Sequence, residues 1–407
     1  MTTTNPQPSN FTREPPDESG GFIEWLRKNL FNTWYNGVVT IAIVSFLLWI
    51  AAGFIIWARM EAQWNVIPAN LPLFLVGRFP KDQYWRLWVL LALIALLSGM
   101  TWGFLVRRTT TLFTQPIIIG ISVVAMLVLV IPTPTVYRLM AIALLALHVF
   151  SAWGGRQIGT IKPLLGRWLP FSWFLSLIVA VWLIGGGLGL KAVSTNLWGG
   201  LMLTLLMSVI SILLCFPLGV LLALGRQSPL PVIRWLSVAY IELIRGLPLI
   251  TILFMGQILL PLFLPEGMRP DRVLRAIVGL TLFSSAYLAE NVRGGLQAIP
   301  RGQFDAAKAV GLNAPLTLGL IVLPQALKIS IPSIVGQFIS LFQDTTLLAI
   351  VGLVELLGIS RSILANPKFL GRYSEVYLFI GILYWVFCYS MSLASRKLEE
   401  QLNTEHK

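Results

Sequence analysis

The sequence predicts an all-α membrane protein with about ten transmembrane helices, and its composition is the first observation behind that prediction. Of 407 residues, 56% are hydrophobic and only 12% are charged, with a mean hydropathy of +0.79. A typical soluble chain is about one quarter charged. The second observation is a series of apolar runs of about 20 residues, each long enough to cross a ~30 Å hydrocarbon core as a helix. The composition therefore excludes a soluble globular domain.

The apolar runs form two groups of five. The first group comprises 37–58, 85–106, 116–132, 136–153 and 170–188, and the second comprises 198–224, 232–264, 273–292, 318–350 and 375–395. Residues 1 to about 20 contain several prolines and polar residues, so we expect a disordered cytoplasmic tail. Between the last two runs, residues 351–374 mix glycines with polar side chains, which favours a short re-entrant or interfacial helix.

The placement of the basic residues is the third observation, because it gives the predicted helices an orientation. With the N-terminus inside, the cytoplasm receives the larger set: Arg27, Lys28, Arg107, Arg108, Arg156, Lys162, Arg167, Arg226, Arg234, Arg293, Arg301, Lys308, Arg396 and Lys397. This excess follows the positive-inside rule and puts both termini in the cytoplasm. It also accounts for the net charge of +13 without a nucleic-acid partner.

Residues for metal, redox or catalytic chemistry are scarce, so we expect no catalytic residue, metal or cofactor. The two cysteines, Cys215 and Cys388, lie in apolar runs, and His148 is expected to be packed or hydrogen-bonded in another. The best phosphate-loop candidate has Leu190 in place of the second glycine and Ala192 in place of serine or threonine. Any energy from ATP must therefore come from a separate ATPase chain.

A polar interruption at about 300–317 separates two long apolar runs and predicts a helix-turn-helix. Pro300 suits a first helical turn, where its missing N–H costs nothing, and Asp305 in that turn is favoured by the helix dipole. Gly311 is placed to end the helix in a left-handed conformation, and Asn313 can cap a second short helix. The first helix carries small side chains that would let it enter a groove on another protein: Ala306 and Ala307.

Two charged motifs near the expected cytoplasmic ends of helices leave alternatives open. Glu242 and Arg245 precede a Gly-Leu-Pro break, and their spacing lets them pair on one helix face. A local pair beside a kink and a role in gating are equally supported. Glu290 either pairs with Arg293, three residues on, or turns inward to a transport pathway.

A third polar motif, Gln343-Asp344-Thr345-Thr346, lies deep in an apolar run. A charge inside a membrane segment costs roughly 2.5 to 3.5 kcal/mol on insertion scales and usually marks a pathway or a buried pair. We favour the pathway. Asp344, Thr345 and Thr346 beside a helix break could hold the ammonium group of a zwitterion, while helix N-termini could meet its carboxylate.

Two sets of motifs resemble known transport proteins. The helix-turn-helix region resembles the EAA coupling motif of permease subunits of ABC importers through Asp305, Ala306, Ala307, Gly311, Leu323 and Pro324. Asp305 stands where that family usually has glutamate. The region from about 198 to 402 is similar to the permeases of polar amino-acid importers, the histidine, glutamine and general amino-acid group, through Glu242 to Leu249, Ser285 to Gln297, Leu323 to Leu327 and Gln343 to Leu347. Asn291 and Gln343 depart from that group's pattern.

The long N-terminal half is similar to the M-type permease of the general L-amino-acid transporter, which implies five helices before a type I importer core of five. The implied parts are a cytoplasmic tail at 1–36, an additional membrane region at 37–190, the importer core at 191–396 with coupling helices at about 300–317, and a cytoplasmic tail at 397–407. The implied partners are two copies of an ATPase, a second permease in a heterodimer, a periplasmic solute-binding protein and the lipid bilayer. The implied function is inward movement of L-amino acids across the inner membrane by alternating access.

Two rival functions are weighed against this one. A secondary transporter or channel would need intramembrane acids in repeat-related positions, and the first five runs contain almost none. An assembly scaffold without a pathway would keep full uptake after substitution of Asp344. The sequence does not say which amino acids are carried, because in this class selection lies largely in the binding protein.

Overall fold

The computed structural model describes residues 22–108, 111–130, 133–265 and 267–404. These residues form helices joined by short connections, and the β-structure among them is limited to three isolated bridges. The prediction of an all-α fold is confirmed. The expected disordered tail lies outside the described residues. The chain divides into two compact units, Met1–Gln63 and Trp64–Lys407.

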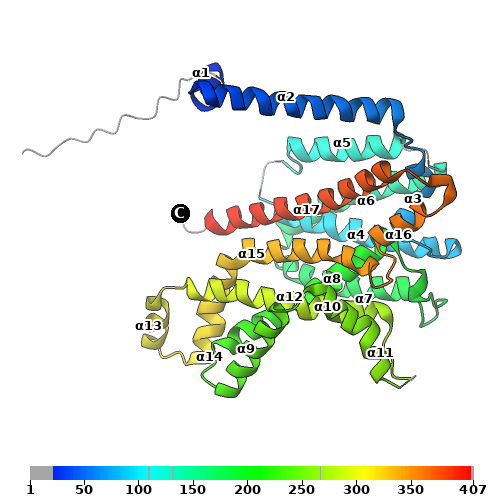
Figure 1. Cartoon of the computed structure of the whole chain (residues 1–407). Coiled ribbons are helices and arrows are strands. Elements are labelled where there is room, and N and C mark those ends of the chain that lie inside the picture. The colour runs from blue at the N-terminus through cyan, green and yellow to red at the C-terminus, as the bar shows by residue number, and fades with distance from the viewer. Residues whose placement is uncertain (1–21, 109–110, 131–132, 266, 405–407) are drawn as a thin grey trace, which may run out of the picture. The chain divides into compact units, whose positions relative to one another are not determined.

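The smaller unit is a short helix followed by a long one. α1 (Phe22–Leu30) is joined to α2 (Trp34–Ile56), and Thr40 Oγ1 donates to the Leu30 carbonyl at 3.1 Å (Figure 1). α2 continues into a π-helix, η1 (Trp57–Glu61), to give 28 helical residues. Its length and apolar composition fit a membrane span over the predicted run 37–58.

The larger unit begins with the N-terminal helices, which we define as α3 to α7. They and their short 3-10 turns are α3 (Val66–Val76), η2 (Lys81–Gln83), α4 (Tyr84–Leu105), α5 (Gln115–Val130), α6 (Thr135–Ile161), η3 (Pro163–Trp168) and α7 (Leu169–Gly185).

α4 and α6 meet at very short range through glycine. A Cβ added at Gly103 would lie 2.1 Å from the Ala152 carbonyl oxygen, and one at Gly99 would lie 2.4 Å from the His148 carbonyl oxygen. The small-xxx-small spacing of these glycines therefore lets two backbones touch. Ser98 Oγ lies 3.0 Å from His148 Nδ1, so the prediction of a hydrogen-bonded histidine is confirmed.

The rest of the larger unit forms the core helices, which we define as α8 to α17. They and the short elements among them are η4 (Thr195–Leu197), α8 (Gly200–Arg226), α9 (Pro231–Arg245), α10 (Leu249–Phe254), η5 (Met255–Leu259), α11 (Leu260–Phe263), α12 (Arg272–Gln297), α13 (Arg301–Ala309), α14 (Ala314–Leu316), η6 (Thr317–Val322), α15 (Leu323–Asp344), η7 (Thr345–Ala349), α16 (Leu356–Leu364), η8 (Pro367–Phe369) and α17 (Tyr373–Thr404).

The break predicted at Gly246-Leu247-Pro248 is a sharp bend. α9 and the segment formed by α10, η5 and α11 meet at 101°. Pro248 stands before α10 in an extended conformation. Proline cannot continue the α9 hydrogen-bond ladder, and the residue before it disfavours helical geometry, so the helix must end here.

The number of membrane spans is close to the prediction. Among the described residues, eight helices are long and apolar enough to cross a membrane, or up to nine if the bent pair counts as one span. Nine of the ten predicted runs coincide with one helix each, and the run at 232–264 coincides with the two helical segments that meet at the bend. The run at 116–132 is the short one, because the 16 residues of α5 rise only about 24 Å.

α12 lies at the centre of the core helices and packs against α8, α9 and α15 (Figure 1). Of its most apolar window, 61% is buried, the largest share among the candidate spans. Two apolar clusters hold it, one around Leu203, Met207, Leu280 and Leu348 and the other around Cys215, Leu288, Val292 and Leu341. This packing fixes the helix that carries Glu290.

The stretch 351–374, for which a short re-entrant or interfacial helix was predicted, contains the short helix α16, which is partly buried. α16 buries Leu356, Ile359 and Ile363 against α3, α8 and α17. The Glu355 carboxylate caps it and accepts from the N–H groups of the second and third residues of the helix, Leu357 and Gly358, at 2.8 Å each.

Candidate functional site

The residues at 300–317 fold as the predicted helix-turn-helix. α13 ends in a Schellman motif, in which Gly311 N–H donates to the Lys308 carbonyl at 2.9 Å and Leu312 N–H donates to the Ala307 carbonyl at 3.0 Å. Gly311 has φ +80°, the left-handed conformation predicted for it. A residue with a Cβ would be strained at this position.

The start of α13 differs from the prediction in one detail. The helix begins at Arg301 with Pro300 as its N-cap, so Asp305 lies in the second turn, and its predicted place in the first turn is wrong. The helix dipole acts mainly within the first turn and gives this carboxylate little support. The predicted second cap is confirmed, because the Asn313 side chain accepts from Leu316 N–H at 3.1 Å.

α13 is exposed over most of its length. Asp305, Ala306 and Gly311 are exposed, whereas Ala307 is only 4% exposed and holds the helix against the protein. At the start of α15, Leu323 is half-buried and Pro324 is exposed. Five of the predicted coupling residues are therefore accessible at least in part, and Ala307 has a packing role.

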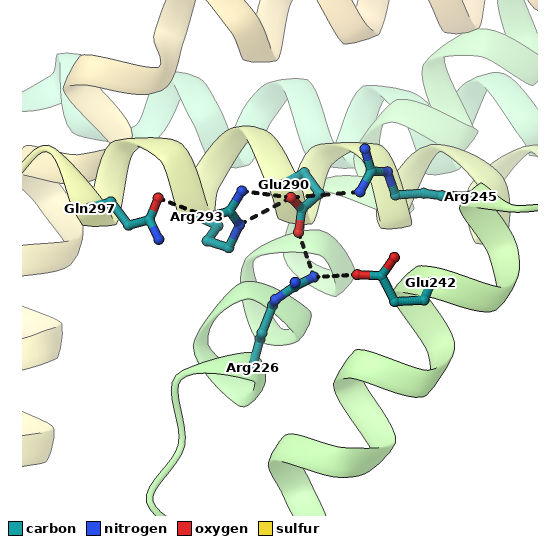
Figure 2. A network of polar contacts seen from close by, with 6 residues as sticks. All are labelled: Arg226, Glu242, Arg245, Glu290, Arg293 and Gln297. Atoms are coloured by element: carbon teal, nitrogen blue, oxygen red, sulfur yellow. Dashed lines mark hydrogen bonds and ion pairs between the residues drawn. The ribbon is translucent and has the colours of Figure 1, made fainter.

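A network of charged side chains joins the ends of α8, α9 and α12 (Figure 2). Glu290 on α12 accepts from Arg226 Nη1 of α8 at 2.8 Å and from Arg293 at 3.0 and 2.9 Å. Arg245 of α9 lies 3.6 Å from the same carboxylate. Arg226 also donates to Glu242 of α9 at 3.0 Å. One carboxylate thus holds arginines from three helices.

This geometry shows which partners the charged side chains of the two motifs take. Glu290 pairs with Arg293, one of the two interpretations weighed above. Glu242 and Arg245 do not form their local pair: Glu242 pairs with Arg226, and Arg245 turns to Glu290. The spacing along α9 allows Glu242 and Arg245 to pair with each other, but each has an oppositely charged partner on a neighbouring helix.

Glu290 is the most shielded member of the network. Its side chain is 15% exposed, against 26% for Arg226 and 36% for Arg245. Leaving a shielded charge without its partner costs much more than breaking an exposed pair. Loss of this one carboxylate would therefore remove a partner from all three arginines at once.

Three members of the network were not predicted as site residues. Arg226 was used only for topology, and Arg293 was used for topology and as a possible partner of Glu290. Gln297, whose Oε1 accepts from Arg293 Nη1 at 2.7 Å, was used only in the family resemblance. A sequence signal existed for Arg226, which ends an apolar run at the same expected membrane level as Glu242 and Glu290. Nothing in the sequence shows that the three helices carrying these residues bring them into contact.

Asp344 stands apart from this network. It is the last residue of α15, it is half-buried, and it makes no hydrogen bond or ion pair with any described residue. The hydroxyls that follow donate to their own helix, Thr345 Oγ1 to the Phe342 carbonyl at 2.7 Å and Thr346 Oγ1 to the Gln343 carbonyl at 2.8 Å. An unpaired carboxylate in a membrane segment is costly, so a cation that reaches it is bound favourably.

The predicted pathway residues thus fall into two groups. Glu242, Arg245 and Glu290 belong to the network, whereas Asp344 and Thr346 are partly accessible at the end of α15. Thr345 is fully buried and out of reach of a passing molecule. In the described part of the chain, no group of three or more His, Cys, Asp or Glu side chains could hold a metal ion.

Comparison with known proteins identifies the family. Residues 215–403 match the family described as binding-protein-dependent transport system inner membrane component. Over 407 aligned residues, the chain is 37% identical to the inner membrane amino-acid ABC transporter permease protein YhdY of Escherichia coli, with 96% of both chains covered. The chain belongs to this family of ABC transporter permeases. It is therefore a multi-pass inner-membrane transport subunit and not itself an enzyme, and its family implies a separate ATPase, a binding protein and a second permease.

Two more relatives show how much of the permease is shared. The glutamate/glutamine/aspartate/asparagine transport system permease protein BztC of Rhodobacter capsulatus is 36% identical, with 97% of both chains covered. The probable glutamine ABC transporter permease protein GlnP of Bacillus subtilis is 38% identical over 203 residues, which is 92% of that protein but 50% of this permease. Some relatives therefore match only about half of this chain.

Proposed function

We propose that this permease is the membrane subunit of an ATP-driven importer that moves L-amino acids into the cytoplasm by alternating access. The substrate class is supported by the relatives, which are named for the transport of amino acids, glutamine or glutamate, aspartate and their amides. The structural observation that carries the proposal is the exposed α13, a capped helix that connects α12 to the segment leading into α15.

α13 is the contact that we assign to the ATPase. Only residues 298–300 separate it from α12, and on the other side α14 and η6 run directly into α15. A displacement of α13 is therefore transmitted to the helices that carry Glu290 and Asp344. The docking set comprises Asp305, Ala306 and Gly311 on the exposed face, Ala307 behind it, and Leu323 and Pro324 at the base of α15. Two copies of the ATPase would each take one such helix from a heterodimer of permeases.

Asp344 is the residue that we assign to the ammonium group of the substrate. At an effective dielectric constant of about 20, opposite charges ~4 Å apart attract by ~4 kcal/mol, enough to favour a zwitterion at an otherwise unpaired carboxylate. Thr346, two residues on, is the second polar side chain that we assign to substrate contact. Thr345, which is buried between them, keeps the end of α15 in place through its hydrogen bond to the Phe342 carbonyl. The network of Glu242, Arg245 and Glu290 closes the pathway at the end nearer α13.

The orientation that we propose has both termini, α13 and the charged network in the cytoplasm. It is supported by the excess of arginine and lysine in the loops on that side. The binding protein then delivers its amino acid to the opposite face, where α11 and the loop before α12 lie.

The test is uptake of labelled amino acids by proteoliposomes that hold this permease with its co-purifying subunits. We expect uptake only when lumenal ATP and the binding protein are both present, a strong reduction in Asp344→Asn and partial recovery in Asp344→Glu, which keeps the charge. Uptake driven by an ion gradient alone would establish a secondary carrier instead. Full uptake by Asp344→Asn would leave the permease as a scaffold for a pathway in another chain.

A further inference from the structure

A groove on the core helices shares only one residue, Pro324, with the function proposed above. It has a volume of about 360 Å³ and runs along one face of α15, with single contributions from α8 and α17. The α15 residues recur every three or four positions, as one helix face requires. The lining includes Phe216, Leu327, Lys328, Ile331, Val335 and Leu398.

Lys328 is the one charged group in this groove. Its side chain is half-buried, and it makes no hydrogen bond or ion pair with any described residue. Glu399, next to Leu398 on α17, accepts from Ser395 at 2.9 Å and forms no ion pair with Lys328. A lysine in a membrane span normally pairs or extends its amine toward the interface. Lys328 instead lines an apolar groove.

The dimensions of the groove match one leaflet of a bilayer. From Pro324 to Phe338 the helix rises about 21 Å, which is about half of the ~40–45 Å thickness of a bilayer with its headgroup regions. The ring of Phe338 contacts that of Phe216 at a centroid distance of 6.4 Å and forms the deep end of the groove. Lys328 lies near the other end, on the side where α15 joins the α13 region.

We propose that the groove binds an anionic phospholipid of the leaflet on the α13 side. The phosphate pairs with the Lys328 ammonium group, and an acyl chain lies along Leu327, Ile331 and Val335. Basic pockets between transmembrane helices on the cytoplasmic side have this chemistry. A free amino acid would also offer a carboxylate to Lys328, but its ammonium group would meet no carboxylate or hydroxyl side chain in the lining. The proposal rests on the proposed function only in calling this leaflet cytoplasmic.

The test is cross-linking in nanodiscs that contain the purified transporter complex, phosphatidylcholine and a small share of phosphatidylglycerol with a photoactivatable acyl chain. We expect the label, mapped by mass spectrometry, on the α15 peptide that contains Ile331 and Val335. Labelling should fall about fivefold in Lys328→Gln, the loss expected for one basic residue near a membrane surface. It should return in Lys328→Arg and stay unchanged in Arg234→Gln, which removes an exposed charge on α9 outside the groove.

Three results would overturn the proposal. They are equal labelling of the wild type and Lys328→Gln, equal labelling by a phosphatidylcholine probe with the same acyl group, and protection of the groove by a partner chain or by added amino acids. The experiment needs no transport. A failed uptake assay with positive labelling would therefore reject the importer and keep the lipid site, and the reverse result would reject only the lipid site.

Discussion

Two groups of helices in the larger unit are held together by different physical means. α4 and α6 meet backbone to backbone at Gly99 and Gly103, where no atom can be added without moving a main chain. α8, α9 and α12 are joined at one end by charged side chains, and Arg226 lies between two carboxylates, Glu242 and Glu290. The first contact has a single arrangement, whereas the second can exchange partners at low cost.

Because of this difference, we call the α4–α6 pair the frame, and we call the ends of α8, α9 and α12 that carry the charged network the moving part. Close packing is not continuously deformable, so the α4–α6 pair should keep its geometry through a transport cycle. The charged network sits where α9 bends by 101° and one short link away from α13. We therefore expect the cycle to act on the network and to leave the α4–α6 pair unchanged. The family match, which begins at residue 215, falls on the part that we expect to move.

Breaking the frame should have the largest effect. In Gly103→Val the new Cβ would lie 2.1 Å from the Ala152 carbonyl oxygen, so the two backbones must separate. Overpacking of this kind costs ~3 kcal/mol, and we expect a clear fall in the thermal unfolding midpoint of the purified complex. Gly154→Val on α6 is the matched control, because nothing lies within 4 Å of its Cβ. Equal midpoints for the two variants would show that the close contact is not a frame.

Glu355 adds a third kind of contact to the comparison, because it caps α16, which packs against α3, α8 and α17. Burial raises the pKa of Glu355 from 4.5 to about 7, while the hydrogen bonds from Leu357 and Gly358 N–H and from Tyr384 OH oppose the rise. Between these values the folded state binds more protons than the unfolded state, so stability falls as the pH rises.

The expected loss from Glu355 between pH 4.5 and 8 is about 3 kcal/mol at most. Unfolding midpoints of the wild type and Glu355→Gln measured across this range should converge at low pH and separate at high pH, with the variant the more stable there. Parallel curves would mean that the carboxyl group is not held in its protonated form.

Glu290→Gln tests the moving part. The change weakens contacts to three arginines at a shielded position and should cost ~2 kcal/mol. We also expect ATP hydrolysis that no longer depends on the binding protein. Glu242→Gln removes one contact from a side chain that is 56% exposed, so it should cost less than ~1 kcal/mol. Similar behaviour of the two variants in ATPase and unfolding assays would argue against Glu290 as the centre of the network.

Gly311→Ala should have a small effect on stability and act mainly on coupling. Alanine at φ +80° costs ~1 to 2 kcal/mol locally, which disturbs the turn after α13. The measurement is the number of amino acids transported per ATP hydrolysed, and we expect it to fall. Gly302→Ala, within α13 and without a positive φ, should leave the ratio unchanged. A normal ratio in Gly311→Ala would mean that the turn does not transmit motion.

The helices were predictable because a long apolar run in a membrane protein has few alternatives to a helix. Gly311 and Asn313 were predictable for a similar reason, since each has a local conformational role that its own residue type favours. The partners of Glu242 and Arg245 were not. Arg226 is 64 residues from Glu290 along the chain, and no spacing rule brings them together. The first residue of α13 was also misplaced, and this changed the expected environment of Asp305.

The most direct test of the account measures both groups of helices in one assay. Spin labels at Leu243 on α9 and Gly294 on α12 report on the moving part, and labels at Leu105 on α4 and Ile161 on α6 report on the frame; all four positions are exposed. Distances are compared without nucleotide and with the complex arrested by ATP and the binding protein. We predict that the α9–α12 distance distribution shifts and the α4–α6 distribution does not. A shift between α4 and α6, or none between α9 and α12, would contradict the account.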